Sequence, residues 1–259
     1  MRNVSVPEYQ REIYSHGFYT RLRRVRWLFR YDCRYRLFLM EELFRKYRVP
    51  FERMKVYELG FGTGYLLFRF DNTSTLHGCE LVEEAVNAIK RDPRLRRYEK
   101  TNFVCANPDG SPRFPSSDYD LVIASHVLEH MPDDNLTLKL LSAHTRSGGL
   151  GLFFLPLEPP GHCPATHART YTAAGFTTLL ESTGWEVIES CGNFRYSSHW
   201  VQVVNLPYRR QVPVVGPLVE TLENICLSLP PTSFVRLMEK PLAYLHVKPR
   251  QLMVLARRS

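Results

Sequence analysis

The 259-residue sequence lacks any apolar run approaching the roughly 20 residues that a membrane-spanning helix requires. Its Arg-rich N-terminus also lacks the uninterrupted apolar stretch of a secretory signal. We therefore expect a cytoplasmic location and no transmembrane segment. There is no internal repeat and no low-complexity tract, which favours one continuous fold.

Cysteines are few and scattered. The six cysteines lie at positions 33, 79, 105, 163, 191 and 226, and none forms a C-x-x-C pair. This spacing argues against a disulfide framework and against a cysteine-based zinc site, and it favours reduced, mostly buried thiols.

Most of the chain lacks a net positive charge. The formal net charge is +8, but residues 1–50 hold 12 Lys and Arg against 5 Asp and Glu, so the remainder is nearly neutral. A nucleic-acid-binding surface over the whole protein is therefore not expected, whereas a basic N-terminal arm or lid is. The segment 21–31 mixes arginines with aromatic residues. It could bind an acidic substrate, nucleic acid or, weakly, an anionic membrane surface, or it could be an amphipathic helix packed on the core.

Short apolar strands and amphipathic helices alternate along the sequence. We predict strands at 55–59, 75–80, 102–105, 120–124, 151–155, 185–190 and 251–256. We predict helices within 1–50, after Gly64, at 82–90, 133–144 and 172–183, and near 218–227, with Thr172 as an N-cap. This alternation predicts an α/β fold with a doubly wound, mostly parallel, seven-stranded sheet.

Three glycines at alternate positions follow the first predicted strand: Gly60, Gly62 and Gly64. Glycine lets the backbone turn sharply and lets a ligand approach main-chain N–H groups without a Cβ in the way. The third glycine of the dinucleotide-binding fingerprint would fall at position 65, which is Tyr65. A tight strand-to-helix turn without a ligand is the alternative interpretation of the motif.

The glycines, with Glu58 two positions before the first, resemble motif I of class I S-adenosylmethionine-dependent methyltransferases. The resemblance places Glu58 and Gly60 near the methionine part of that cofactor, and it makes Phe61, Gly62 and Gly64 further cofactor-binding residues. It also implies a Rossmann-like fold whose last strand is antiparallel.

Two later segments continue the resemblance. Glu80, followed by Leu81, ends the second predicted strand, where a carboxylate can accept both ribose hydroxyl hydrogens. After the third strand, Asn107 or Asp109 takes the place of the residue that contacts the adenine edge in the family, and the sequence leaves the choice between them open.

The segment 118–133 closely resembles the fourth-strand motif of the methyltransferase group that contains the ubiquinone and menaquinone pathway enzymes. This places Ser125 and His126 at the cofactor. The segment 167–172 resembles many bacterial small-molecule methyltransferases. The likeness extends from about residue 50 to 190, so the acceptor is expected to be recognised by the remaining segments.

Histidines near the end of the fourth strand are candidates for catalysis. His126 or His130 could remove a proton from an acceptor hydroxyl, with His167 as a further candidate. Alternatively, Glu129 and His130 cap the following helix and His126 packs under the adenosine. His126, Glu129, His130, His162 and His167 are all metal-ligand types, but their spacing fixes no coordination geometry, and we predict no metal site.

The resemblance divides the chain into an N-terminal helical lid (1–50), an S-adenosylmethionine-binding core (51–192), an insertion or substrate cap (193–248) and a last core strand (249–259). It implies methylation, by S-adenosylmethionine, of a small-molecule acceptor that is apolar, aromatic or acidic, with oxygen as the favoured atom and a biosynthetic or secondary-metabolite pathway as the setting. A nucleic-acid methyltransferase is disfavoured, because the fourth strand lacks the Asn/Asp-Pro-Pro-aromatic motif. Two further alternatives to a methyltransferase stay open. The protein could be a non-catalytic or membrane-peripheral module that binds the cofactor, or it could use the cofactor in a reaction other than methylation. The sequence indicates no oligomeric state.

Overall fold

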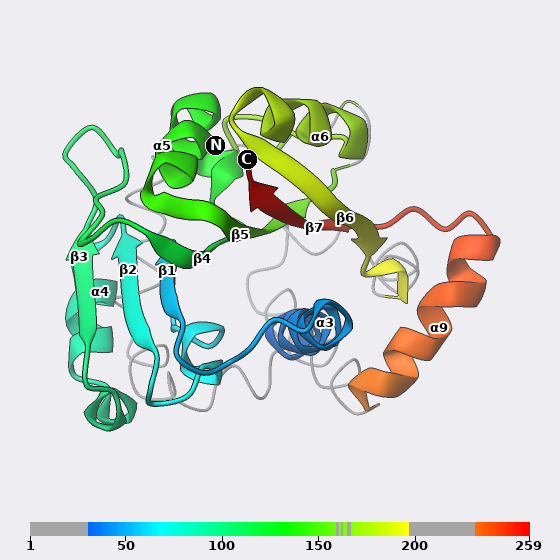
Figure 1. The fold of residues 1–259 in the computed structure, drawn as a ribbon. Helices are drawn as coiled ribbons and strands as arrows, with labels where there is room; N and C mark the ends of the chain where they lie inside the picture. The colour runs from blue at the N-terminus through cyan, green and yellow to red at the C-terminus, as the bar shows by residue number, and fades with distance from the viewer. Residues whose placement is uncertain (1–30, 159–160, 162, 165–166, 197–230) are drawn as a thin grey trace, which may run out of the picture. The chain divides into compact units, whose positions relative to one another are not determined.

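A computed structural model describes residues 31–158, 161, 163–164, 167–196 and 231–259, which are coloured in Figure 1. They belong to two compact units. The described part of the first unit lies within residues 50–191 and 251–259, and that of the second lies within 31–49 and 192–250.

The first unit is built on one seven-stranded sheet with the order β3-β2-β1-β4-β5-β7-β6. Its strands are β1 Lys55–Leu59, β2 Thr75–Glu80, β3 Thr101–Cys105, β4 Tyr119–Ser125, β5 Thr145–Pro156, β6 Trp185–Asn193 and β7 Gln251–Arg258. β1 pairs in parallel with β2 and β4, β2 with β3, and β4 with β5, whereas β7 runs antiparallel to β5. The predicted doubly wound α/β sheet with an antiparallel last strand is confirmed.

Five strands are longer than predicted, and β5, β6 and β7 are each longer by two or more residues at one end. β5 begins at Thr145, well before the predicted start at Gly151, and β6 and β7 also continue past their predicted ends. The added residues include Arg146, Ser147 and Gly148, which are exposed and carry no apolar alternation. Sequence patterns detect the buried part of a strand, so the exposed extensions escaped prediction.

The α-helix predicted after Gly64 is absent. The chain forms only the one-turn 3₁₀ helix η1, Leu67–Arg69. Asp71 then turns the backbone by accepting hydrogen bonds from the backbone N–H of Thr73, at 3.0 Å, and from its hydroxyl, at 2.7 Å. Because β2 begins at Thr75, this turn leaves too little chain for a longer helix.

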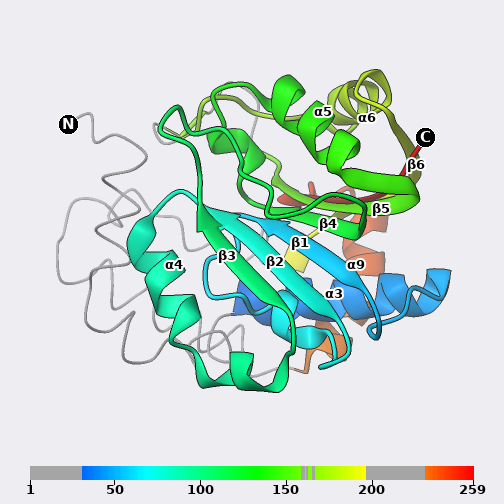
Figure 2. The same ribbon diagram turned by 60° about the vertical axis from the view of Figure 1, so that its left-hand side comes forward.

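The other helices of this unit follow the prediction. They are α4 Glu83–Lys90, α5 Asp134–His144 and α6 Ala173–Ser182, with short 3₁₀ helices η2 Pro93–Arg97 and η3 Leu128–His130. Thr172 caps α6 as predicted, since its side chain accepts a hydrogen bond from the N–H of Gly175. Figures 1 and 2 show α5 and α6 side by side, and α4 beside β2 and β3. Leu138 and Leu141 of α5 and Phe176 and Leu180 of α6 pack with Trp185 in one buried cluster.

The second unit joins α3, Tyr31–Tyr47, to the chain around α9, Thr232–Tyr244. The rings of Tyr31 and Tyr35 lie 5.6 and 5.0 Å from that of Phe194, and Arg236 Nε lies 2.7 Å from Glu42 Oε2. The predicted N-terminal helix and the start of the predicted insertion thus pack together. α9 was not predicted, because Pro241 in its last turns argues against a helix. The helix predicted near 218–227 lies outside the described residues.

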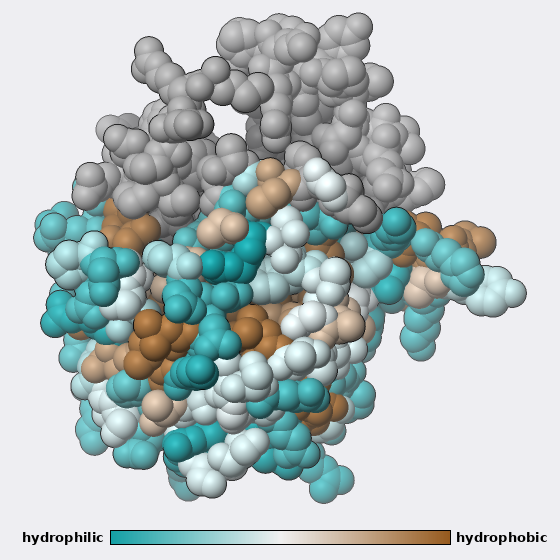
Figure 3. Space-filling model, turned by 90° about the horizontal axis from the view of Figure 1, so that it is seen from above, coloured by the Kyte–Doolittle hydropathy of each residue, from teal (hydrophilic) through white to brown (hydrophobic). Residues whose placement is uncertain are grey.

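In the part of the chain that the structure describes, no helix has the length and apolar character needed to span a membrane. Figure 3 shows one face of the molecule, on which apolar side chains form small patches separated by hydrophilic ones. The basic and aromatic segment 21–31, on which the predicted weak membrane association depends, lies outside the described residues except for Tyr31.

Candidate functional site

The glycine turn after β1 adopts a backbone that residues with side chains avoid. Gly60, Gly62 and Gly64 have φ values of +68°, +51° and +70°. A Cβ on Gly60 would lie only 2.9 Å from Cγ2 of Val127, which follows β4. Glycine is therefore required at position 60 both by conformation and by the close approach of the neighbouring loop.

Glu80, at the end of β2, supports this turn. Its carboxylate is buried, and Oε2 accepts a hydrogen bond from the N–H of Gly62 at 3.0 Å, while Oε1 accepts one from the N–H of Leu81 at 2.8 Å. A carboxylate can accept about four hydrogen bonds, so these two do not exhaust its capacity. The carboxylate predicted to bind ribose hydroxyls therefore also ties the second strand to the glycine turn.

A cavity of about 340 Å³ opens at this end of the sheet. This volume lies within the range of small-molecule sites. Five of its lining residues were predicted from sequence: Gly60, Glu80, Leu81, Asp109 and His130. Eight others were not predicted: Leu59, Cys79, Ala106, Pro108, Gly110, Val127, Met131 and Pro132. Most of these eight flank predicted residues, and the apolar side chains among them carry no chemical signature that a sequence motif could reveal.

Several predicted cofactor residues lie outside the cavity lining. Glu58 is buried within β1, and Gly62 and Gly64 shape the turn. The ring of Phe61 packs edge-on against Phe103, with centroids 5.2 Å apart. Phe61 can therefore meet a ligand through its backbone and not through its ring.

The turn after β3 separates the two adenine candidates. Asn107 donates its side-chain N–H to Ser111 Oγ at 2.9 Å, whereas exposed Asp109 accepts hydrogen bonds from the backbone N–H and the hydroxyl of Ser111. These bonds from Ser111 lower the pKa of Asp109. Only Asp109 of the two lines the cavity, so the geometry favours it as the contact to the base.

The end of β4 holds Ser125 and His126. Ser125 pairs with Phe154 of β5, and the backbone N–H of His126 donates to the carbonyl of the same residue at 2.9 Å. His126 Nε2 lies 2.8 Å from Gln251 Oε1, and its Nδ1 lies 3.7 Å from Glu129 Oε1. Neither Ser125 nor His126 lines the cavity.

The segment after β5 is bound to the η3 turn. The N–H of Ala168 donates to the carbonyl of Glu129 at 2.7 Å. The guanidinium of Arg169 donates to the carbonyls of Leu128, Met131 and Pro132, at 3.2, 2.6 and 2.8 Å. These bonds hold residues 168–169 against residues 128–132.

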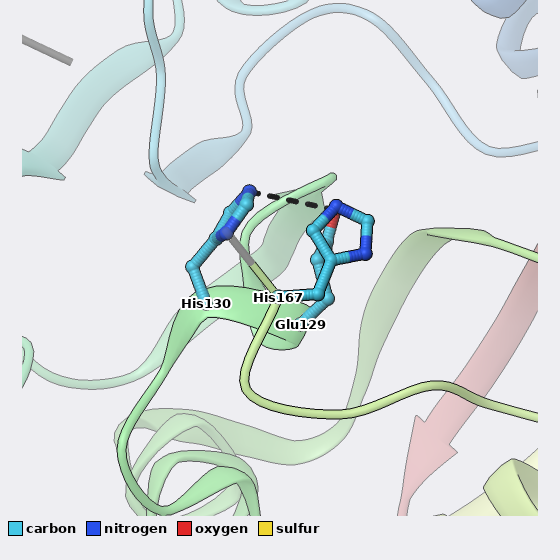
Figure 4. A group of neighbouring side chains, drawn as sticks. All are labelled: Glu129, His130 and His167. Carbon is cyan, nitrogen blue, oxygen red and sulfur yellow. Dashed lines mark ion pairs between the residues drawn. The ribbon is translucent and has the colours of Figure 1, made fainter. Parts of the chain in front are cut away.

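This attachment brings His167 to His130, with ring centroids 5.0 Å apart. Glu129, which also belongs to η3, has a side chain that is 1% exposed, and its Oε1 lies 3.9 Å from His130 Nε2. Figure 4 shows the three side chains projecting into the same space. The alternative in which Glu129 and His130 cap the next helix is wrong, because Asp133 is the N-cap of α5 and accepts from the N–H of Leu136 at 2.8 Å. His162, the remaining histidine candidate, lies outside the described residues.

Comparison with known families identifies the glycine turn and the strands around it. Residues 57–150 match the family model described as a methyltransferase domain. That span contains the cavity lining, the glycine turn and the η3 residues, but not His167. None of the curated proteins matches the chain.

Solved structures share the fold at low identity. A protein of Galdieria sulphuraria proposed to be a sarcosine dimethylglycine methyltransferase is 14% identical, with a TM-score of 0.57 over 86% of this chain and 83% of that one. The [4+2]-cyclase SpnF is 16% identical, with a TM-score of 0.56 over 86% and 80% of the two chains. YcgJ of Bacillus subtilis is 13% identical, with a TM-score of 0.52 over 86% and 97%.

The family match, the strand order and the cavity agree with one another. Gly60 and Glu80 both line the cavity, so a glycine backbone and a carboxylate face any ligand that enters it. Residues 57–150 therefore match a methyltransferase domain, set in a sheet with the fold shared by these structures, and S-adenosylmethionine is the cofactor that such a domain implies.

Proposed function

We propose that this enzyme methylates an oxygen atom of a small-molecule acceptor. The observation that carries the proposal is the position of His130, whose side chain lines the same cavity as Gly60 and Glu80. An imidazole in that wall can reach an acceptor hydroxyl, and histidine has the side-chain pKa best suited to accept its proton near neutrality.

The bound cofactor supplies a methyl group on a positively charged sulfur, which is already activated for transfer. Gly60 and Glu80 hold the cofactor, and this alignment of donor and acceptor can supply about 7–11 kcal/mol of the barrier. His130 assists the removal of the acceptor's O–H proton. With the cofactor bound, the methyl group would pass to the acceptor oxygen as the carbon–sulfur bond breaks, the bonding pair would remain on sulfur, and the acceptor's proton would be held by His130.

The acceptor is expected to be apolar or planar and to carry a carboxylate or phosphate. Apolar residues of the cavity, such as Leu59, Val127 and Met131, favour such a molecule over a highly polar one. Residues 1–50 and 193–248 are the proposed lid and cap, because the acceptor needs shielding from water and the basic N-terminal segment can bind its anionic group. Membership of the ubiquinone-type group, a biosynthetic pathway and a cytoplasmic location belong to the same proposal.

Nucleic acid is a weaker candidate acceptor. The fourth strand leads into Ser125-His126 and not into the motif used for methylating base amino groups, and nearly all of the net positive charge lies in the first fifty residues. A non-methylating reaction is also worth testing, because the [4+2]-cyclase SpnF shares this fold.

The test is incubation of the full-length enzyme with methyl-labelled cofactor and a panel of phenols, hydroxy acids and amines, followed by mass spectrometry. A labelled product from a hydroxyl compound, blocked when that hydroxyl is removed, supports the proposal. Labelled amines alone, or a product of changed structure without a labelled methyl group, would overturn it.

A further inference from the structure

The Glu129–His130–His167 cluster is built from two elements that are distant in sequence. Glu129 and His130 belong to η3, and His167 follows β5. One donor atom from each side chain lies within 4.8 Å of the other two. In the described part of the chain, this is the group of histidine, cysteine and acidic side chains that meets the spacing of a metal site.

Two imidazoles and one carboxylate form a recognisable ligand set. First-row transition-metal dications, above all Zn²⁺, bind such mixed nitrogen and oxygen donors, whereas Mg²⁺ and Ca²⁺ prefer oxygen alone. Three protein ligands also leave a coordination position open, as in catalytic zinc sites. Ligand atoms around Zn²⁺ lie about 3.4 Å apart at bond lengths of about 2.0–2.1 Å, so side-chain rotations suffice to close the present spacing.

The surroundings of Glu129 fit a cation. Its carboxylate is 1% exposed, and its Oε1 lies 3.7 Å from His126 Nδ1 and 3.9 Å from His130 Nε2. A buried carboxylate is costly unless positive charge compensates it. A dication bound by Glu129, His130 and His167 would interact favourably with this carboxylate without requiring either imidazole to be protonated.

The protein also holds these ligands in place. Ala168 donates to the Glu129 carbonyl, and Arg169 clamps the carbonyls on both sides of His130. Glu158 Oε1 lies 3.9 Å from His167 Nδ1, where a carboxylate can orient a metal-binding imidazole. A site assembled by backbone hydrogen bonds loses little entropy when the ion binds.

We infer that Glu129, His130 and His167 form a binding site for one transition-metal dication of the Zn²⁺ type. Because His130 also lines the cofactor cavity, the ion would lie at the cavity wall. There the acceptor oxygen can occupy the open coordination position of the ion. The ion then lowers the pKa of the acceptor hydroxyl, which releases its proton to water. This last role rests on the proposed function, in which His130 then acts as a ligand of the ion and no longer as the base.

The test begins with full-length protein that has been stripped by a chelator and then titrated with Co²⁺, read by visible absorption, and with Zn²⁺, read by calorimetry. We expect one ion per chain. Glu129→Gln and His167→Gln should each weaken binding by at least about 100-fold, since even outer-shell changes cost 10–100-fold. His144→Gln is the matched control, because His144 lies at the end of α5, stacked on Phe114, and should bind as wild type does. Absence of saturable 1:1 binding, or equal affinity in all variants, overturns the site.

Two further measurements examine the ligands of the ion and the separation of the ion site from the cofactor site. X-ray absorption at the zinc edge of the wild-type protein should show two imidazoles, and a shell without imidazole refutes the site even if the variants misfold. His167 does not line the cavity, so His167→Gln should bind S-adenosylhomocysteine as tightly as wild type while losing the ion. Equal methyl transfer by stripped and loaded enzyme would remove the role in acceptor activation. A bound ion without transfer to any acceptor would count against the proposed function and leave the site standing.

Discussion

His126 Nε2 lies 2.8 Å from Gln251 Oε1, which links the end of β4 to the first residue of β7. The amide oxygen can only accept, so in this bond Nε2 carries a proton and donates it. The other nitrogen faces Glu129. His126 is thereby held as a structural bridge beside the cluster, which makes His130, in the cavity wall, the stronger candidate for contact with the acceptor.

Replacing His130 should therefore affect turnover more than replacing His126. We expect His130→Ala to lower kcat by about 10²–10⁴-fold and to remove a limb of its pH profile, because activation of the acceptor oxygen is lost. His126→Gln should lower kcat by less than tenfold, with an unchanged pH profile. Steady-state kinetics over pH 5–9 with the identified acceptor checks both. If both variants, and His167→Ala, turn over normally, catalysis is by positioning alone.

Glu80 should contribute strongly to cofactor affinity. Glu80→Ala removes the proposed hydrogen bonds to the ribose and the bond to the Gly62 N–H, and we expect binding of S-adenosylhomocysteine to weaken by about 2–3 kcal/mol. The control is Glu84→Ala on α4, an exposed carboxylate outside the cavity. Calorimetry compares the two variants, and an unchanged affinity for Glu80→Ala would exclude this carboxylate from the cofactor site.

Gly60→Ala should damage both stability and binding. The substitution forces a side chain into the left-handed region and against Val127, which together cost about 2–4 kcal/mol of unfolding free energy. Gly148→Ala is the matched control, because its φ is +70° but a Cβ there meets nothing within 4 Å. That variant should lose only about 1–2 kcal/mol and keep full cofactor affinity. Urea denaturation and calorimetry measure the two effects, and equal losses in both variants would contradict the close contact at Gly60.

Burial of His77 should make the protein less stable in mild acid. Burial, with a smaller contribution from Lys55, lowers the pKa of His77 from 6.5 to about 4, and its Nδ1 lies 3.0 Å from the Tyr119 hydroxyl. Between pH 6.5 and 4 the unfolded chain binds more protons than the folded one, so stability falls as the pH decreases through that window.

After allowance for solvent screening at this half-buried ring, the loss attributable to His77 should be about 1–2 kcal/mol. Urea denaturation at pH 7 and pH 4.5 measures the difference in wild type and in His77→Gln. The variant should be less sensitive to acid, and an equal difference in both proteins would show that other groups cause it.

The N-terminal segment can be tested by deletion at residue 30. A cut at residue 35 would remove Tyr31 and Tyr35, which pack against Phe194, so the shorter deletion preserves α3. We expect deletion of residues 1–30 to leave affinity for S-adenosylhomocysteine within a few-fold, and to abolish productive acceptor binding if the segment is the proposed lid. A truncated enzyme with normal KM and kcat would show that residues 1–30 are not part of the acceptor site.

Much of the core is determined by the sequence locally. β1 and β2 begin and end at their predicted residues, and Thr172 caps α6 as expected, because apolar periodicity and capping chemistry act within a few residues. The glycine turn and Glu80 could be identified for the same reason, since both directly follow buried strands. Such patterns failed at two places. They do not show how few residues a turn leaves for a helix, as after Gly64, and they do not show that packing can stabilise a helix that contains Pro241, as in α9.

Only the tertiary structure decided which polar groups meet. Gln251 reaches His126 because β7 lies beside β5 in the sheet. No local sequence pattern determines the order of strands in a sheet. His167 reaches His130 because Arg169 and Ala168 bind carbonyls of a loop that lies far away in sequence. Hydrogen bonds between two loops form only where the sheet brings those loops together. The sequence therefore showed which residue types could form the cluster, but it did not show that their side chains lie close to one another.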